Sequence, residues 1–269
     1  MPRALRILLA LVISLVPHCI HGAEISLGED DVGQLWLQVI GRIDDGDDAK
    51  FRGMLVDAIN RQEQIINVSI YSPGGSTIPA MKIGRYIRTL HLTTVAPESF
   101  PFLTLRVCRI YARSGKPIAM DYDPLTGRGD PRCTCESECF LMWAAGTARL
   151  WSGVDLARLS LQHEQAPGAV VEQPDMRSQA AVTDYLREMG IPESTIARAA
   201  AMAPGQSEHL TADEKNLLET KTGLPRFDEP FRSRCRVHKP TSPAQLGCER
   251  AISRELYWAG AKRLLNEPE

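Results

Sequence analysis

The strongest constraint on the fold is an alternating apolar segment that ends in two adjacent glycines. Apolar residues alternate through residues 66–71, which predicts a buried β-strand. The turn at residues 72–75 follows, and apolar residues then recur at helical spacing over residues 80–90, so we expect a helix to begin near Ser76. Glycine permits close approach of another backbone or of a substrate, and free N–H groups at a helix start can stabilise a negative charge. The alternative is a glycine turn that serves packing alone.

A serine opens a second predicted helix, and a histidine ends a predicted strand further along the chain. The run Cys135-Glu136-Ser137-Glu138-Cys139 leads directly into the apolar residues 140–146, and residues 159–163 have the pattern of a short strand that ends in His163. By default a serine in this place is a helix cap, and a strand-end histidine is structural. A nucleophilic serine would also need a base and donors for the oxyanion.

The order of these motifs resembles the Clp protease proteolytic subunit and crotonase-like superfamily, and more closely its secreted bacterial branch. The resemblance covers about residues 35–228, with one large interruption. It implies an α/β fold, a crotonase-like (Clp protease-like) β-α-β spiral with a helical tail. It also implies that Ser137 is the nucleophile and His163 the base, with the backbone N–H groups of Gly75 and Glu138 as oxyanion donors.

The third member of a catalytic triad has no residue-for-residue match in this chain. The family places an aspartate upstream of its last core helix, where this chain has residues 203–208 without one. Glu208, Asp184 and Asp213 are candidates to orient His163, although Asp213 also belongs to a predicted capping box. A Ser–His dyad can keep part of a triad's activity, because the members of a triad contribute unequally.

The first 23 residues have the layout of a secretory signal peptide. Arg3 and Arg6 precede an apolar run at residues 7–16, and Ala23 offers a small residue for cleavage. The run is short for a membrane span, so an uncleaved anchor is the alternative. We therefore expect a periplasmic or secreted protein with no stable membrane span after cleavage. A formal net charge of −2 argues against a nucleic-acid partner.

An even number of cysteines in an exported chain favours disulfide bonds. Six remain after the leader is removed: Cys108, Cys133, Cys135, Cys139, Cys235 and Cys248. Cys235 and Cys248 are the simplest pair. Cys108 and Cys133 would close the inserted segment, and Cys135 and Cys139 lie one helical turn apart. Other pairings and a zinc site stay open, although no histidine pair stands nearby at ligand spacing. We expect the oxidation state of the two cysteines that flank Ser137 to affect its position; the alternative is that they are apolar filling.

The chain is expected to fold as one domain with appendages. Residues 24–229 would form the Clp protease/crotonase-like domain, and residues 230–269 a C-terminal extension that ends in a helix. Strand and helix patterns alternate up to residue 95, which predicts parallel strands joined by crossovers. Residues 97–132 are an insertion with two hairpin arms, because a structureless loop of that length is rare. The arms and later helices are predicted at residues 103–111, 116–122, 176–189, 194–202 and 211–222.

The leading hypothesis is an exported, ATP-independent serine hydrolase of the peptidase type that acts on peptides or unfolded protein segments. It requires no cofactor or metal, and the resemblance implies a homo-oligomer. The alternative is a non-catalytic binding or assembly protein on the same fold. The missing third triad residue and the like-signed charge of Glu138 beside any oxyanion favour that alternative. Acyl-CoA chemistry is disfavoured, because an exported protein does not meet CoA esters.

Overall fold

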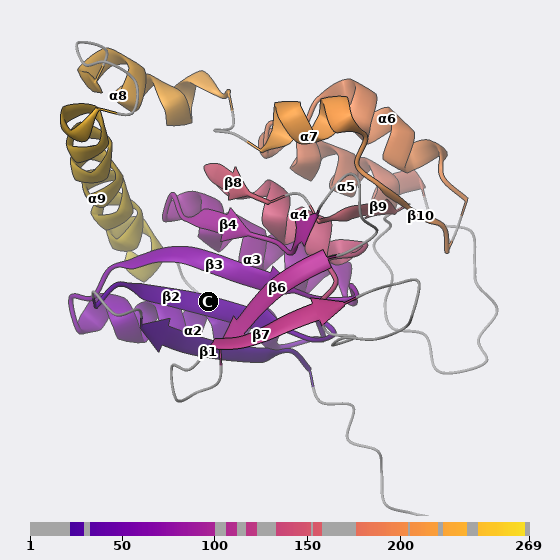
Figure 1. The fold of residues 1–269 in the computed structure, drawn as a ribbon, viewed down its shortest axis with the longest axis horizontal. Coiled ribbons are helices and arrows are strands. Elements are labelled where there is room, and N and C mark those ends of the chain that lie inside the picture. Colours follow the sequence, from indigo (N-terminus) through magenta and orange to yellow (C-terminus); the bar gives the residue numbers. More distant parts are fainter. Residues whose placement is uncertain are drawn as a thin grey trace, which may run out of the picture.

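The alternating strands and helices close into one five-stranded sheet, in the order β1–β2–β3–β4–β8 (Figure 1). Strand β1 is antiparallel to β2, and every other neighbouring pair in this sheet is parallel, as crossover connections require. The strands are β1 (Glu24–Glu29), β2 (Leu35–Ile40), β3 (Ile65–Tyr71), β4 (Thr93–Val95) and β8 (Ala148–Leu150). The computed structural model describes residues 22–29, 33–99, 106–111, 117–122, 133–151, 153–157, 176–203, 205–219, 223–235 and 242–266.

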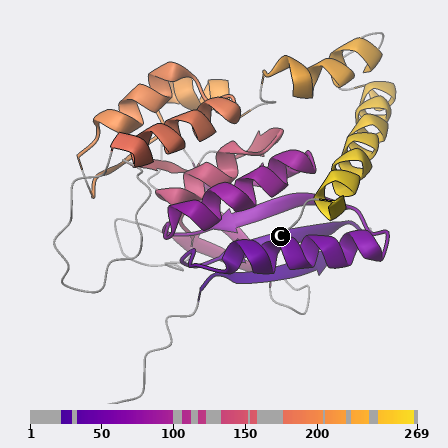
Figure 2. The ribbon, with the colours of Figure 1, turned by 180° about the vertical axis from the view of Figure 1, so that it is seen from behind.

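The central strand β3 is buried on both faces, as a strand covered by helices should be. Helices α2 (Asp47–Asn60) and α3 (Thr77–Thr89) connect β2 to β3 and β3 to β4, and they lie over the same face of the sheet (Figure 2). Each helix buries an apolar stripe at helical spacing, such as Phe51 and Leu55 in α2. The predicted helix near Ser76 is therefore confirmed, and so is the α/β fold class.

Helix α4 (Glu138–Ala144) is almost wholly enclosed, because each of its residues after Glu138 is buried. It packs against α3 and against α5 (Met176–Glu188), whose Tyr185 hydroxyl donates a hydrogen bond of 2.9 Å to the Leu141 carbonyl. A Cβ on Gly84 of α3 would lie 1.8 Å from that hydroxyl, so glycine is required for this approach. The helix that begins beside Ser137 is thus fixed firmly within the core.

Two smaller sheets accompany the main one. The predicted insertion contains an antiparallel hairpin, which lies on the face of the main sheet opposite α2 and α3 (Figures 1 and 2). Its arms are β6 (Arg106–Tyr111) and β7 (Pro117–Tyr122), and β5 (Glu98–Ser99) pairs with β6 to complete a three-stranded sheet. The second small sheet pairs β9 (Asp155–Ala157) with β10 (Ser207–His209) in antiparallel register. Helices α6 (Glu193–Ala201) and α7 (Ala212–Leu218) precede and follow β10 in the sequence.

The C-terminal helices α8 (Pro225–Cys235) and α9 (Pro243–Asn266) are joined by the predicted disulfide between Cys235 and Cys248, with an S–S distance of 2.01 Å. Helix α9 packs against α2 and α3. Its Tyr257 hydroxyl donates to the Glu63 carbonyl at 3.4 Å. Helix α8 spans residue 229, where the sequence suggested the start of an extension.

Some expectations lie outside the described residues or differ from the structure. The leader through residue 21, the segment 159–163 and His163 lie outside them. The predicted capping box of α7 is present, with Thr211 and Glu214 bonded reciprocally, but α7 ends at Leu218 rather than near residue 222. Within the part of the chain that the structure describes, no helix combines the length and apolar character that a membrane span needs.

Candidate functional site

Ser137 stands where a strand-like segment turns into helix α4. The segment before it lies beside the end of β3: the Ser72 N–H donates to the Thr134 carbonyl at 2.7 Å, and the Glu136 N–H donates to the Ser72 carbonyl at 2.9 Å. The chain then turns directly into α4, with Ser137 in the N-cap position. The serine and the glycine turn after β3 therefore meet at the same edge of the sheet, as the two motifs predicted.

The backbone of Ser137 has an unusual conformation, with φ 53° and ψ −117°. This region is sparsely populated by residues other than glycine, and such a conformation costs about 1–3 kcal/mol. The Ser137 side chain makes no capping hydrogen bond, so its default interpretation as a helix cap is wrong. A serine on a sharp, strained turn from strand to helix has the geometry of a nucleophile elbow, which presents the hydroxyl at the edge of a sheet.

The Gly74–Gly75 turn fits closely against this serine. Both glycines have positive φ, 102° and 144° respectively. A Cβ on Gly74 would lie 2.9 Å from the Ser137 Cβ, and one on Gly75 would lie 2.1 Å from the Ile43 carbonyl oxygen. The turn is held by two backbone hydrogen bonds, from the Ile43 N–H to the Gly74 carbonyl at 2.9 Å and from the Ser76 N–H to the Ile43 carbonyl at 2.7 Å. Both positions therefore require glycine because neighbouring atoms leave no room for a Cβ, in addition to the positive φ of the turn.

The side chain of Glu138 occupies one of the two predicted oxyanion donors. The Gly75 N–H donates a hydrogen bond of 2.9 Å to Glu138 Oε2, and the Thr77 hydroxyl donates one of 3.2 Å to Glu138 Oε1. The second predicted donor, the Glu138 N–H, belongs to the first residue of α4 and has no acceptor within its helix. The structure thus brings Ser137, Gly75 and Glu138 together, but the Glu138 carboxylate already accepts from the Gly75 N–H, the first of the two predicted donors.

A disulfide bond brackets the serine. Cys135 and Cys139 are both buried and are joined at an S–S distance of 2.02 Å, which settles the pairing that the sequence left open for them. Cys133 is disulfide-bonded as well, while the side chain of Cys108, its expected partner, lies outside the described residues. Because Cys135 is bonded to another cysteine, it is not a free thiolate ligand for zinc. No group of three or more candidate metal ligands is found among the described residues.

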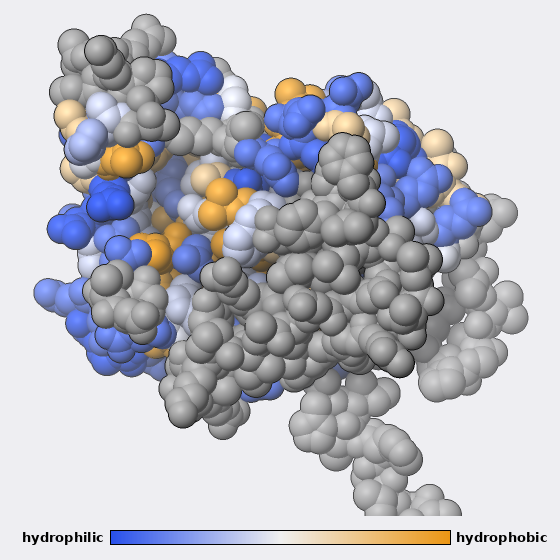
Figure 3. Space-filling view, in the orientation of Figure 1, coloured by the Kyte–Doolittle hydropathy of each residue, from blue (hydrophilic) through white to orange (hydrophobic). Residues whose placement is uncertain are grey.

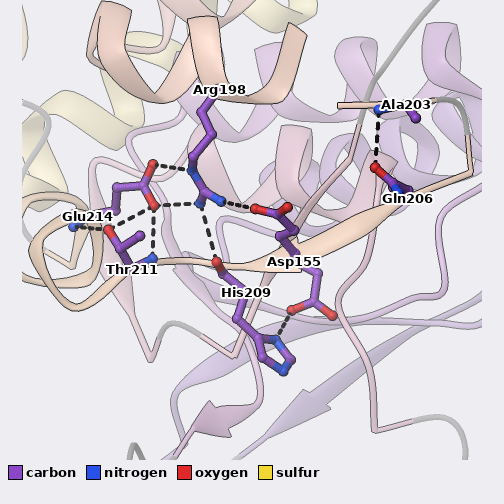
Figure 4. A network of polar contacts seen from close by, with 8 residues as sticks. Asp155, Arg198, Ala203, Gln206, His209, Thr211 and Glu214 are labelled. Atoms are coloured by element: carbon purple, nitrogen blue, oxygen red, sulfur yellow. Dashed lines mark hydrogen bonds and ion pairs between the residues drawn. The ribbon is translucent and has the colours of Figure 1, made fainter. Parts of the chain in front are cut away.

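A histidine–aspartate contact lies on the strands beside the segment that leads to Ser137 (Figure 4). The Asp155 N–H donates to the Cys135 carbonyl at 2.8 Å, so β9 runs next to that segment. On the other side of β9, His209 of β10 is the register partner of Asp155, and His209 Nδ1 contacts Asp155 Oδ1. The Asp155 side chain is 7% exposed, and that of His209 is 73% exposed. A carboxylate at Nδ1 can accept a hydrogen bond from that nitrogen and so orient the ring.

Sequence reasoning missed this contact because its two residues are 54 positions apart and belong to no recognisable motif. Each lies in a strand of only three residues, which is too short to show a convincing alternation. The capping box at Thr211 marked the helix after His209, but it carried no sign of the contact.

Two of the three residues proposed to orient His163, Glu208 and Asp184, are paired with arginines. Glu208 is 58% exposed and pairs with Arg198 at 2.8 Å. Asp184 is 75% exposed and pairs with Arg187 at 3.2 Å on the surface of α5. Because His163 lies outside the described residues, its distance from Ser137 and from these carboxylates is not described.

A separate cavity of about 220 Å³ lies between the β4–β8 edge of the sheet and the two C-terminal helices. Its lining includes His91, Thr147, Asp228 and Arg250. Figure 3 shows hydrophobic residues gathered around a hollow in this part of the molecular face. His91 follows the C-terminal end of α3, whereas Gly75 precedes its N-terminal end. The cavity is therefore distinct from the site at Ser137.

No protein-family model and no curated protein matches this chain. Among solved structures, it is similar to a serine-to-alanine mutant of the 1510-N membrane-bound stomatin-specific protease, with a TM-score of 0.40 and 14% identity. That likeness covers 69% of this chain and 75% of the other. It is also similar to a lysine-to-alanine mutant of the same protease in complex with a substrate peptide, with a TM-score of 0.39 and 15% identity over 69% of this chain and 71% of the other.

Proposed function

We propose that this chain is an exported, ATP-independent serine hydrolase of the peptidase type, with Ser137 as its nucleophile. The observation that carries the proposal is the backbone of Ser137, held at φ 53° and ψ −117° at the start of a buried helix. A serine needed only for capping or packing would not require this conformation, which persists only where the surrounding structure enforces it. The disulfide bonds and the predicted leader support export, since disulfides persist in oxidising compartments.

In the proposed reaction, the Ser137 oxygen attacks the carbonyl carbon of a peptide or unfolded segment and gives its proton to a histidine. The tetrahedral oxyanion is stabilised by the N–H groups of Gly75 and Glu138. The histidine then protonates the leaving amine, and water hydrolyses the resulting acyl-enzyme. The proposed base is His163, as the family resemblance implies. His209 is the second candidate, because Asp155 orients its ring beside the segment that leads to the serine.

One observation favours a second function, a non-catalytic binding or assembly protein. The carboxylate of Glu138 already accepts a hydrogen bond from the Gly75 N–H at 2.9 Å. A protein that has lost catalysis has no need to keep that donor free. Under either function we propose that the chain self-associates into rings or trimers. The family resemblance is the only support for this.

Covalent labelling with a fluorophosphonate separates the two functions. We expect intact-protein mass spectrometry to find one adduct on the mature chain that is absent from Ser137→Ala. It should persist in Ser76→Ala, a matched control at an exposed hydroxyl bonded to Asp45 at 2.9 Å. No adduct on any folded variant, including Glu138→Ala, would favour the binding protein.

The same assay identifies the base. Removal of the true base should slow labelling by about 10²–10⁴-fold, the usual contribution of general-base catalysis. His163→Ala and His209→Ala are compared at equal protein concentration, with circular dichroism to verify folding. A loss in His163→Ala alone supports the family assignment, whereas a loss in His209→Ala alone identifies the histidine that contacts Asp155.

A further inference from the structure

Both carboxylate oxygens of Glu138 are directed into the N-terminal end of α3. Oε2 accepts from the Gly75 N–H at 2.9 Å, and Oε1 accepts from the Thr77 hydroxyl at 3.2 Å. The positive end of a helix dipole favours a negative charge at this place. The carboxylate is therefore bound as an anionic ligand would be, although it belongs to the residue next to the candidate nucleophile.

This carboxylate also fills the space beside the serine. A Cβ built on Gly74 would lie 2.7 Å from Glu138 Oε2 and 2.9 Å from the Ser137 Cβ, so both groups border the same small volume. A substrate carbonyl attacked by Ser137 would have to place its oxygen against the Gly75 N–H. That oxygen and the Glu138 carboxylate cannot accept from the N–H at the same time in the same place.

We propose that Glu138 is a gate that holds the oxyanion site closed, so that the hydrolase rests in a latent state. This inference rests on the proposed function. Acyl transfer requires the carboxylate to leave the Gly75 N–H and the substrate oxygen to replace it. The Glu138 N–H stays in place as the second donor, because it is part of the backbone at the start of α4.

The gate is built to open without unfolding the site. Glu138 is neither fully buried nor part of the apolar core, whereas the next residue, Cys139, is buried and anchored by its disulfide. Among the described residues, the recorded hydrogen-bond partners of the carboxylate are neutral donors, and no cation is paired with it. Rotation of one side chain into solvent therefore exposes the Gly75 N–H while the backbone of the turn stays fixed.

The consequence for the rate follows from the open fraction. If the open form is about 1–10% of the population, the apparent reactivity of Ser137 is reduced about 10- to 100-fold relative to a chain that is always open. Removal of the Glu138 carboxylate should raise the reactivity of Ser137 by the same factor. Removal of another charge near Ser137 should not raise the labelling rate, because the Glu138 carboxylate would still occupy the Gly75 N–H.

The test compares the rate of Ser137 labelling by the fluorophosphonate in the mature wild-type chain and in three variants. We expect Glu138→Ala to label at least about 10-fold faster, following the open fraction above. Glu138→Gln should fall between, since a neutral amide binds the Gly75 N–H more weakly. Glu136→Gln is the matched control, because it removes a neighbouring acid on the other side of the serine, and its rate should stay within about twofold of wild type.

Exchange of the Gly75 amide hydrogen gives a second measurement that does not depend on chemistry at the serine. It should be faster in Glu138→Ala than in wild type and unchanged in Glu136→Gln. Equal labelling rates in wild type and Glu138→Ala, with the hydrolase still active, overturn the gate but leave the proposed function standing. Absence of labelling in every folded variant overturns both.

Discussion

His91 shows how one partly buried side chain can make the stability of the fold depend on pH. It follows α3 in a left-handed conformation, with φ 54°, and its ring packs edge-on against Phe227. Burial, followed by the charges of Arg263 and Arg88, lowers the pKa of its imidazole to about 4. Among the described residues its buried Nδ1 has no hydrogen-bond partner, so no nearby acceptor there stabilises the protonated ring.

Because the pKa of His91 is lower in the folded chain than its ordinary value of 6.5, the unfolded chain takes up the proton first as the pH falls. The stabilisation is complete above about pH 6.5 and is lost as the pH falls toward 4. We expect a loss of about 1–2 kcal/mol, after allowing for the solvent that reaches part of the ring. Urea unfolding at pH 7 and pH 4.5 measures it. His91→Asn, which tolerates the left-handed conformation, should show a smaller pH dependence than wild type; an equal dependence would contradict the assignment.

At the same scale, the sequence was sufficient to bring Ser137, Gly75 and Glu138 to one place. The glycine turn and the serine helix start are local motifs, and parallel strands carry their C-terminal ends to one edge. The direction of the Glu138 side chain was not predictable. Its rotamer depends on the Gly75 N–H and the Thr77 hydroxyl, which approach it only after α3 and α4 have packed.

At the scale of elements, the junction between the strand-like segment and α4 is closed by the Cys135–Cys139 disulfide. The ring that it closes contains Ser137, whose backbone conformation costs about 1–3 kcal/mol. The crosslink disfavours relaxed alternatives for the five residues from Cys135 to Cys139, since it removes conformations of the chain. The disulfide should therefore hold Ser137 in its strained backbone conformation.

We predict that the double variant Cys135→Ala, Cys139→Ala labels at Ser137 at least about fivefold more slowly, the factor that corresponds to about 1 kcal/mol of released strain. Treatment of wild type with reductant should act in the same direction. The matched control is Cys235→Ala, Cys248→Ala, which removes the remote disulfide and should not change the rate. Equal rates in both double variants, with the fold intact, would mean that the buried pair is only packing.

The elements found from the sequence are those with a sustained pattern. Strand β3 and helices α2, α3 and α5 each show several periods of apolar residues, and the hairpin arms of the insertion are confirmed where the structure describes them. Strands β9 and β10 have three residues each and polar members, so periodicity could not reveal them. Their pairing depends on contacts between distant segments and became visible only in the folded chain.

At the scale of the whole molecule, the C-terminal helix α9 closes over the first part of the α/β unit. Its Gly260 lies against the end of α3, where a Cβ would meet the Thr89 carbonyl oxygen at 2.0 Å. Ile252, Tyr257 and Leu264 of the same helix are buried. The sequence predicted a terminal helix but not its contact surface, because a glycine that permits close helix packing looks the same in a sequence as one that does not.

Two glycine substitutions in α9 test whether this helix is part of the cooperative fold. Gly260→Ala should destabilise the chain by about 1–3 kcal/mol, because its Cβ overlaps backbone that cannot move aside easily. Gly247→Ala, in the same helix, has nothing within 4 Å of its Cβ and should be neutral or stabilising by up to about 1 kcal/mol. Urea unfolding followed by circular dichroism and tryptophan fluorescence should show one transition that shifts to lower urea for Gly260→Ala alone. If Gly260→Ala instead moves only an early, separate transition, α9 unfolds as an independent appendage and its packing does not stabilise the sheet that carries Ser137.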